Sequence, residues 1–136
     1  MLVVNSENNS HARAIAEILK GADEMSIAIA FLKRSGANHI APILKRCLAE
    51  GGSVEIYIGS DFFLTEPEAL KLLLAIGEKQ PACNIHLAKQ GSATFHPKVY
   101  FARRGTNYRS LIGSANLTGG AIRSNEELSV SLKHKA

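Results

Sequence analysis

One short segment in the last third of the chain carries side chains suited to phosphodiester chemistry. His96 and Lys98 are two residues apart, which on a strand places both side chains on the same face. A neutral imidazole can attack phosphorus as a covalent nucleophile without bringing a like charge to the anion. The ammonium of Lys98 can stabilise the phosphoryl oxygens. The pair therefore indicates attack on a phosphodiester without a metal.

Three further side chains follow in an order that completes such a site. Ser114 and Asn116 come directly after the next predicted strand, where they can act as neutral hydrogen-bond donors at a strand end. Glu126 lies just before the last predicted strand, and its carboxylate can fix the imidazole tautomer and stabilise positive charge on the ring. The predicted catalytic residues are His96, Lys98, Asn116 and Glu126, and the predicted substrate-binding residues are Lys98, Ser114 and Asn116.

The distribution of carboxylates and cysteines predicts a reaction without a metal or a cofactor. Two-metal phosphodiesterases need several clustered carboxylates, whereas residues 89–136 contain only Glu126 and Glu127. Cys83 and His86 lack a second pair at the spacing of a zinc site. Asp61 follows a predicted strand and is interpreted as a turn residue.

The elements that must position these side chains follow from the periodicity of apolar residues. Helices are predicted for residues 10–20, 39–49 and 65–79, and strands for residues 25–31, 54–58, 84–88, 94–102, 108–112 and 127–132. Alternation of strands and helices, followed by a hairpin-rich end, predicts an α/β domain with a mixed sheet in an α/β/α layered arrangement. We expect one domain over residues 1–136, with Phe95, Val99 and Phe101 entering the core.

The net charge of +4 is unevenly distributed along the 136 residues. Residues 1–88 carry 8 basic and 10 acidic side chains, whereas residues 89–136 carry 8 basic and 2 acidic side chains. A concentrated positive potential favours an anionic partner such as nucleic acid, an acidic lipid head group or a phosphorylated ligand. No apolar run approaches the roughly 20 residues that span a bilayer, and no secretory signal is recognisable. The expected location is therefore cytoplasmic, without membrane contact.

The ordered residues resemble the motif of the phospholipase D superfamily, His-x-Lys-x4-Asp followed by Gly-Ser-x-Asn and a later Glu. The residues that match are His96, Lys98, Gly113, Ser114, Asn116 and Glu126. The chain departs from the motif at Arg103, where the full motif has aspartate. Several nuclease-type members also lack that aspartate, so the resemblance implies a phospholipase D-like fold and a nuclease rather than a lipid-hydrolysing branch.

The resemblance also implies a site built from two copies of the motif. In this superfamily one histidine forms a phosphohistidine, while a second protonates the leaving oxygen and then activates water. The single copy here predicts a homodimer in which two His96 side chains meet across a twofold axis. The favoured function is a metal-independent phosphodiesterase, a nuclease with DNA favoured over RNA. The alternatives are a non-catalytic nucleic-acid-binding module of a larger restriction or helicase protein, and a phospholipid phosphodiesterase.

Overall fold

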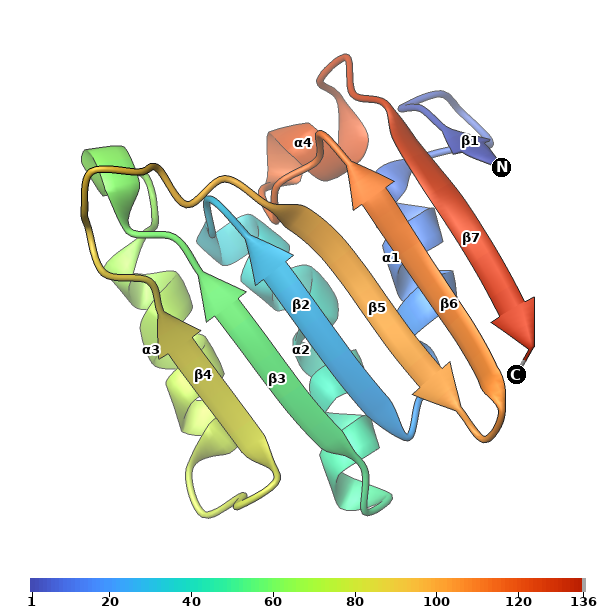
Figure 1. The fold of residues 1–136 in the computed structure, drawn as a ribbon, viewed down its shortest axis with the longest axis horizontal. Helices are drawn as coiled ribbons and strands as arrows, with labels where there is room; N and C mark the ends of the chain where they lie inside the picture. Colours follow the sequence, from blue (N-terminus) through green and yellow to red (C-terminus); the bar gives the residue numbers. More distant parts are fainter. Residues whose placement is uncertain (136) are drawn as a thin grey trace.

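The computed structural model describes residues 1–135 as a seven-stranded mixed sheet covered by four α-helices (Figure 1). The helices are α1 (His11–Leu19), α2 (Arg34–Ala49), α3 (Pro67–Gly77) and α4 (Gly119–Arg123), with a 3₁₀ turn η1 (Asp61–Phe63). The strands are β1 (Leu2–Val3), β2 (Glu24–Ile29), β3 (Ser53–Ile58), β4 (Cys83–Leu87), β5 (Lys98–Arg104), β6 (Asn107–Gly113) and β7 (Ser129–Lys135). Their order in the sheet is β1-β7-β6-β5-β2-β3-β4. None of the helices within residues 1–135 has the length and apolarity needed to cross a membrane.

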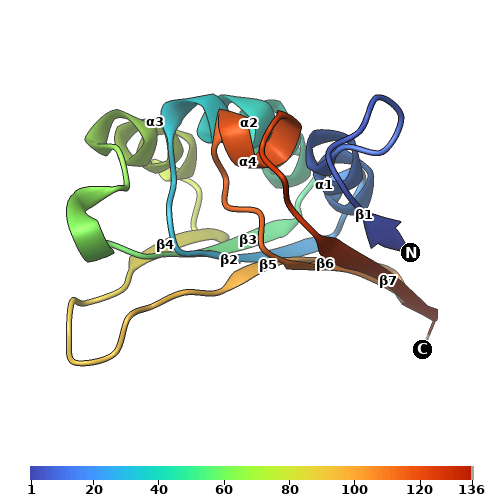
Figure 2. The same ribbon diagram turned by 90° about the horizontal axis from the view of Figure 1, so that it is seen from above.

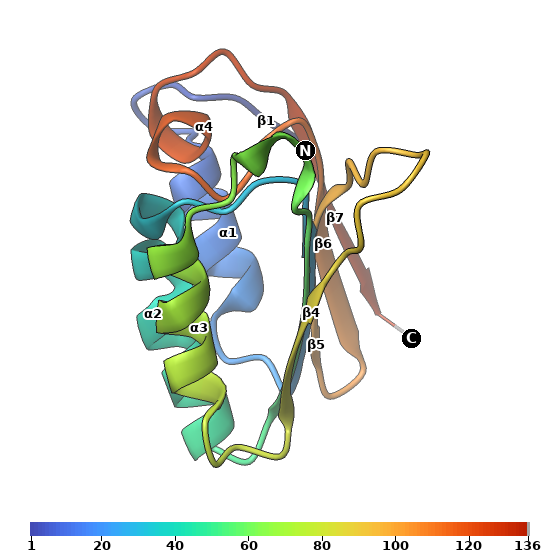
Figure 3. The same ribbon diagram turned by 90° about the vertical axis from the view of Figure 1, so that its left-hand side faces the viewer.

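All four helices lie on the same face of the sheet, as the two rotated views show (Figure 2 and Figure 3). The loop between β4 and β5 projects from the opposite face (Figure 3). The predicted α/β class with a mixed sheet is confirmed, but the second helical layer is absent from the described residues. The parallel strands β2, β3 and β4 follow one another in a single direction, and crossovers of one hand place both connecting helices on one side.

Strand β5 lies at the centre of the sheet and is antiparallel to β2. Lys98 pairs with Ile29, so β5 begins where β2 ends. Tyr100 is buried beneath the helices, and its hydroxyl donates to the carbonyl of Ala115 over 3.0 Å. Because that bond satisfies the phenol, the tyrosine can enter the core.

The prediction that Phe95, Val99 and Phe101 enter the core is wrong. All three side chains are half-buried, and Val99 and Phe101 alternate along β5 with the buried Lys98, Tyr100 and Ala102. The register aligns Tyr100 with the buried Ile27 and Leu111, and neighbouring residues on a strand point to opposite faces. The apolar character of Val99 and Phe101 does not by itself decide which face of β5 is covered.

Helix α2 begins at Arg34, five residues before the predicted start. The first turn requires glycine at position 36, because a Cβ on Gly36 would stand 2.0 Å from the carbonyl oxygen of Leu117. The amide of Lys33 also donates to that carbonyl over 3.0 Å. The segment after β2 is thus fixed against the segment after β6, and this contact brings the two ends of the site together.

Candidate active site

His96 and Lys98 meet at the beginning of β5. His96 lies in the exposed segment before the strand, not within it as predicted, whereas Lys98 is 8% exposed. The Lys98 ammonium lies 2.7 Å from Nδ1 and 2.9 Å from Nε2 of His96, and it donates to the His96 carbonyl over 3.1 Å. An ammonium only donates, so the ring nitrogen that it bonds is an acceptor of a neutral imidazole. Burial lowers the pKa of Lys98, and the nearby Glu127 carboxylate opposes that shift.

Asn116 reaches the same place through Phe31, two residues beyond the end of β2. Its side-chain oxygen accepts a hydrogen bond of 2.9 Å from the amide of Phe31. The ring of Phe31 stands edge-on to His96, with the ring centroids 6.0 Å apart and an interplanar angle of 77°. This arrangement fixes the plane of the Asn116 amide and leaves its Nδ2 to donate elsewhere.

Ser114 is connected to the chain that enters β7. Its Oγ donates to the carboxylate of Glu127 and accepts from the amide of Leu128 over 3.0 Å. The close approach requires Gly113, because a Cβ at that position would lie 2.3 Å from the Leu128 carbonyl oxygen and 2.2 Å from Ser129 Oγ. The glycine of the Gly-Ser-x-Asn sequence therefore has a packing role beside the site.

Glu127, which was not predicted as a site residue, is the carboxylate that the structure connects to the other side chains. Its charge raises the pKa of Lys98 against the effect of burial, and it adds to the raised pKa of buried Tyr100. Glu126 is exposed, and lines a shallow hollow together with Ser114 and Glu127. No local pattern separates Glu127 from Glu126, because both precede β7, which begins at Ser129.

A buried histidine, also absent from the prediction, supports the chain beside Glu127. His11 is fully buried, with Nδ1 2.9 Å from the Asn5 side-chain oxygen and Nε2 2.9 Å from Ser129 Oγ. Because the amide oxygen only accepts, Nδ1 carries the proton and Nε2 accepts from the serine. Burial lowers the pKa of His11, which keeps the ring neutral, whereas the charge of Glu127 acts in the opposite direction.

The sequence matches the family model described as cardiolipin synthase, phospholipase D-like domain, over residues 14–136. The chain belongs to this family. No curated protein matches the sequence significantly. The family assignment confirms the resemblance that His96, Lys98, Gly113, Ser114 and Asn116 carry in the sequence.

Solved structures of other proteins share the fold of this phospholipase D-like domain. Polyphosphate kinase from Porphyromonas gingivalis aligns with a TM-score of 0.65 at 13% identity, covering 96% of this chain and 22% of the kinase. An archaeal chromatin protein with a novel mode of DNA binding gives 0.62 at 13% identity, covering 98% and 45%. A mutant of yeast tyrosyl-DNA phosphodiesterase 1 gives 0.57 at 12% identity, covering 99% and 32%. The domain spans less than half of each of these chains.

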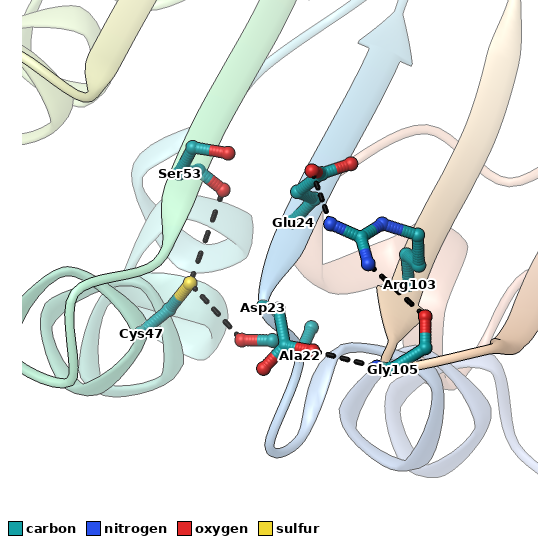
Figure 4. Close-up of polar contacts among 7 residues, drawn as sticks. All are labelled: Ala22, Asp23, Glu24, Cys47, Ser53, Arg103 and Gly105. Carbon is teal, nitrogen blue, oxygen red and sulfur yellow. Dashed lines mark hydrogen bonds and ion pairs between the residues drawn. The ribbon is translucent and has the colours of Figure 1, made fainter.

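Arg103, at which the phospholipase D-like motif is broken, lies far from His96. It stands five residues beyond Lys98, about 17 Å along the strand, and its guanidinium donates to Glu24 and to the Gly105 carbonyl (Figure 4). The amide of Gly105 in turn donates to Asp23 over 2.6 Å. The hydrogen bond from Arg103 lowers the pKa of Glu24. The departure from the motif therefore affects the turn between β5 and β6.

The arrangement at the start of β5 can bind an anion beside the imidazole of His96. Lys98 supplies the positive charge and the Asn116 amide supplies a donor, whereas the single hydroxyl proton of Ser114 is donated to the carboxylate of Glu127. Within residues 1–135, no group of three or more His, Cys, Asp or Glu side chains has the arrangement of a metal site.

Proposed function

We propose that this domain is a phosphodiesterase acting on nucleic acid, with His96 as the nucleophile. One observation carries the proposal: the imidazole of His96 lies 2.7 Å from the ammonium of the buried Lys98. A phosphate oxyanion is a stronger acceptor than an imidazole nitrogen. Substrate binding would draw the Lys98 hydrogen bond to phosphate and free the nitrogen of His96 for attack.

The proposed reaction has two steps and needs no redox partner. In the first, the freed nitrogen of His96 forms a bond to phosphorus, and the bond from phosphorus to the leaving oxygen breaks. The leaving oxygen takes a proton from the imidazolium form of His96 of the partner subunit, which becomes a neutral imidazole. In the second, that histidine takes a proton from water, the water oxygen attacks phosphorus, and the nitrogen–phosphorus bond breaks. Lys98 and Asn116 stabilise the charge on the phosphoryl oxygens in both steps.

Nucleic acid is the proposed substrate because the last third of the chain, which contributes His96 and Lys98, carries an excess of positive charge, although Arg103, Arg104 and Arg109 lie at the other end of β5 and β6. Residues 89–136 carry a net charge of +6, which favours a polyanion. The chromatin protein and the tyrosyl-DNA phosphodiesterase, whose names refer to DNA, share the fold. We propose DNA as the first substrate to test, and a homodimer as the active form because the chain carries one His96.

The test is cleavage of DNA by the purified protein in EDTA, with the solution mass measured by light scattering. We expect a dimer that cleaves DNA, and His96→Ala should reduce the rate by about 10³-fold or more. His134→Ala is the matched control because that side chain is exposed on β7. This control should cleave at the rate of the unchanged protein.

Other results would replace the proposal with a defined alternative. Activity that requires added Mg²⁺ would show the metal-free mechanism to be wrong, and cleavage by a strictly monomeric protein would exclude the shared site. Salt-dependent DNA binding without turnover would assign a non-catalytic nucleic-acid-binding module. Release of head groups from phospholipid vesicles, without DNA cleavage, would assign a phospholipid phosphodiesterase.

A further inference from the structure

Two consecutive phenylalanines on the turn η1 are exposed to solvent. The exposed fractions are 66% for Phe62 and 90% for Phe63. Their φ angles are +58° and +53°, in the left-handed region that disfavours bulky side chains. The exposure and the backbone conformation are both costly, and no residue of η1 is buried. Packing within the chain therefore does not account for two aromatic rings at this position.

Hydrogen bonds hold this turn in place from both sides. On one side, Ser60 Oγ donates to the Ala88 carbonyl over 2.8 Å, and Gln90 Nε2 donates to the Ser60 carbonyl over 2.9 Å. On the other, Thr65 Oγ1 accepts from the amide of Leu32 over 3.2 Å. The turn is therefore attached to the segments that follow β2 and β4, so the two rings are presented on a supported loop.

The same turn is connected to the segment that carries His96. The carboxylate of Asp61 accepts from the amide of Phe95 over 3.0 Å. Phe62 and His96 are the immediate chain neighbours of these two residues, and consecutive Cα atoms are 3.8 Å apart. In Figure 1 the green η1 turn lies beyond the carboxyl end of β3, towards the β4 edge of the sheet. The sequence analysis interpreted Asp61 as a turn residue, and this bond gives it the additional role of joining the two loops.

Exposed cations lie on the segments that are attached to this turn. Lys33 and Arg34 follow β2, and Lys89 follows β4. The amide of Arg34 donates to the carboxylate of Glu66 over 2.8 Å, which joins the start of α2 to the region after η1. Exposed aromatic rings among lysines and arginines are typical of proteins that bind single-stranded nucleic acid, because the rings stack on bases and the cations contact phosphates.

We propose that Phe62 and Phe63 form a base-stacking platform for a single-stranded nucleic acid whose phosphodiester lies at His96. This inference rests on the proposed function and adds a substrate class to it. The supported loop, the aromatic exposure and the neighbouring cations together carry the inference. When a single-stranded nucleic acid enters the site, the bases adjacent to the phosphate under attack would stack on Phe62 and Phe63.

The chain contains no tryptophan, so a single Phe63→Trp substitution supplies a fluorescent probe on the platform. The His96→Ala background prevents turnover, and the probe ligand is a single-stranded oligodeoxythymidylate. We expect the oligonucleotide to quench the emission, because a base stacks on the indole ring. Leu74→Trp is the matched control, since Leu74 is 56% exposed on α3. Its emission should not change.

A second measurement separates stacking from simple apolar contact. In the His96→Ala background, Phe63→Ala should lower the affinity for the oligonucleotide about tenfold. Phe63→Leu should lower it equally, because leucine is apolar but cannot stack, whereas Phe63→Tyr should retain the affinity. Since Phe63 is 90% exposed, these variants are expected to keep the circular dichroism spectrum of the parent.

Several results would overturn the platform. The first is Phe63→Trp emission that the oligonucleotide does not quench, and the second is full oligonucleotide affinity in Phe63→Leu. The third is a shift of the Phe63→Trp emission caused by anionic phospholipid vesicles but not by the oligonucleotide. The fourth is dissociation of a dimer by Phe63→Ala. The vesicle result would assign the rings to a lipid surface, and the dissociation result to a subunit contact. Quenching of the probe, together with failure of the protein that retains His96 to cleave DNA, would retain the platform and refute the proposed catalysis. Cleavage by the protein that retains His96, without quenching of the probe, would refute the platform and retain the catalysis.

Discussion

Each end of strand β5 carries a positively charged side chain, but the two charges have different surroundings. At the beginning of the strand, the ammonium of Lys98 is buried and contacts the neutral imidazole of His96. At the other end, the guanidinium of Arg103 is partly exposed and paired with Glu24. A buried cation without an ion pair is costly, whereas an exposed ion pair adds little to stability.

This difference indicates which end of β5 is adapted to bind an anion. The Arg103 charge is compensated within the protein, so an added phosphate would have to compete with the carboxylate of Glu24. The Lys98 charge is moderated by Glu127 at longer range but is not bonded to it in the described residues. A phosphate at this end can therefore gain the full hydrogen bond. Under the proposed function, the same strand combines a reactive end with a structural end.

The strongest test of this contrast replaces each cation by a neutral side chain of similar length. Lys98→Met should reduce DNA cleavage by about 10²–10³-fold, because it removes the charge that stabilises the phosphoryl oxygens. Arg103→Met should leave the cleavage rate unchanged, since its partners lie at the far end of the strand. The measurement is kcat/KM on one DNA substrate, with folding checked by circular dichroism. Equal losses in the two variants would contradict the contrast.

A second comparison concerns the adjacent carboxylates at the reactive end. Glu127→Gln should lower the cleavage rate on the order of 10²-fold, because Glu127 accepts from Ser114 and acts on Lys98. Glu126→Gln changes the same charge on an exposed side chain and should stay near the rate of the unchanged protein. Steady-state rates at one pH are sufficient. A larger loss for Glu126→Gln would restore the assignment made from the sequence.

The smallest predicted effect concerns the pH dependence of stability. Burial lowers the pKa of His11 below its ordinary value of 6.5. The unfolded chain therefore binds a proton in a range where the folded chain does not, and the free energy of unfolding should fall as pH decreases below about 6.5. Above that pH the contribution is fully present.

Urea denaturation at several pH values would measure this effect. His11→Gln should be less stable by about 1–3 kcal/mol at pH 7.5, because one buried hydrogen bond is lost. It should also show a shallower fall of stability between pH 6.5 and 5. A variant that keeps the full pH dependence would place the titrating group elsewhere.

Most elements and the order of the motif were predictable from the sequence, because both depend on local patterns. The α1 prediction is confirmed with Ser10 as its N-cap, where the Oγ accepts from the amide of Arg13. The start of α2 was not predictable from local preference, since Gly36 usually interrupts helices. Its reason is a contact with Leu117, which is distant in the sequence.

The site was predictable in composition but not in detail. Lys98 lies on β5 as expected, but on the buried face with Tyr100 and not on the face opposite the core. His96 lies outside the strand because β5 begins at Lys98. The choice between Glu126 and Glu127 depends on where β7 begins, and strand boundaries are the least certain part of a pattern. His11 could not be assigned, because its partners are brought to it only by the tertiary fold.

The position of Arg103 has a consequence for how related sequences are found. A search pattern that requires aspartate five residues after the motif lysine depends on a residue at the end of β5, next to the turn into β6. In this chain Arg103 stands at that position and pairs with Glu24. Such a pattern would reject this chain although His96, Lys98 and Asn116 are all present. A pattern that weights each position by its distance from the imidazole would retain it. Homologues whose hairpins have diverged would then be recognised by the half of the motif that does chemistry.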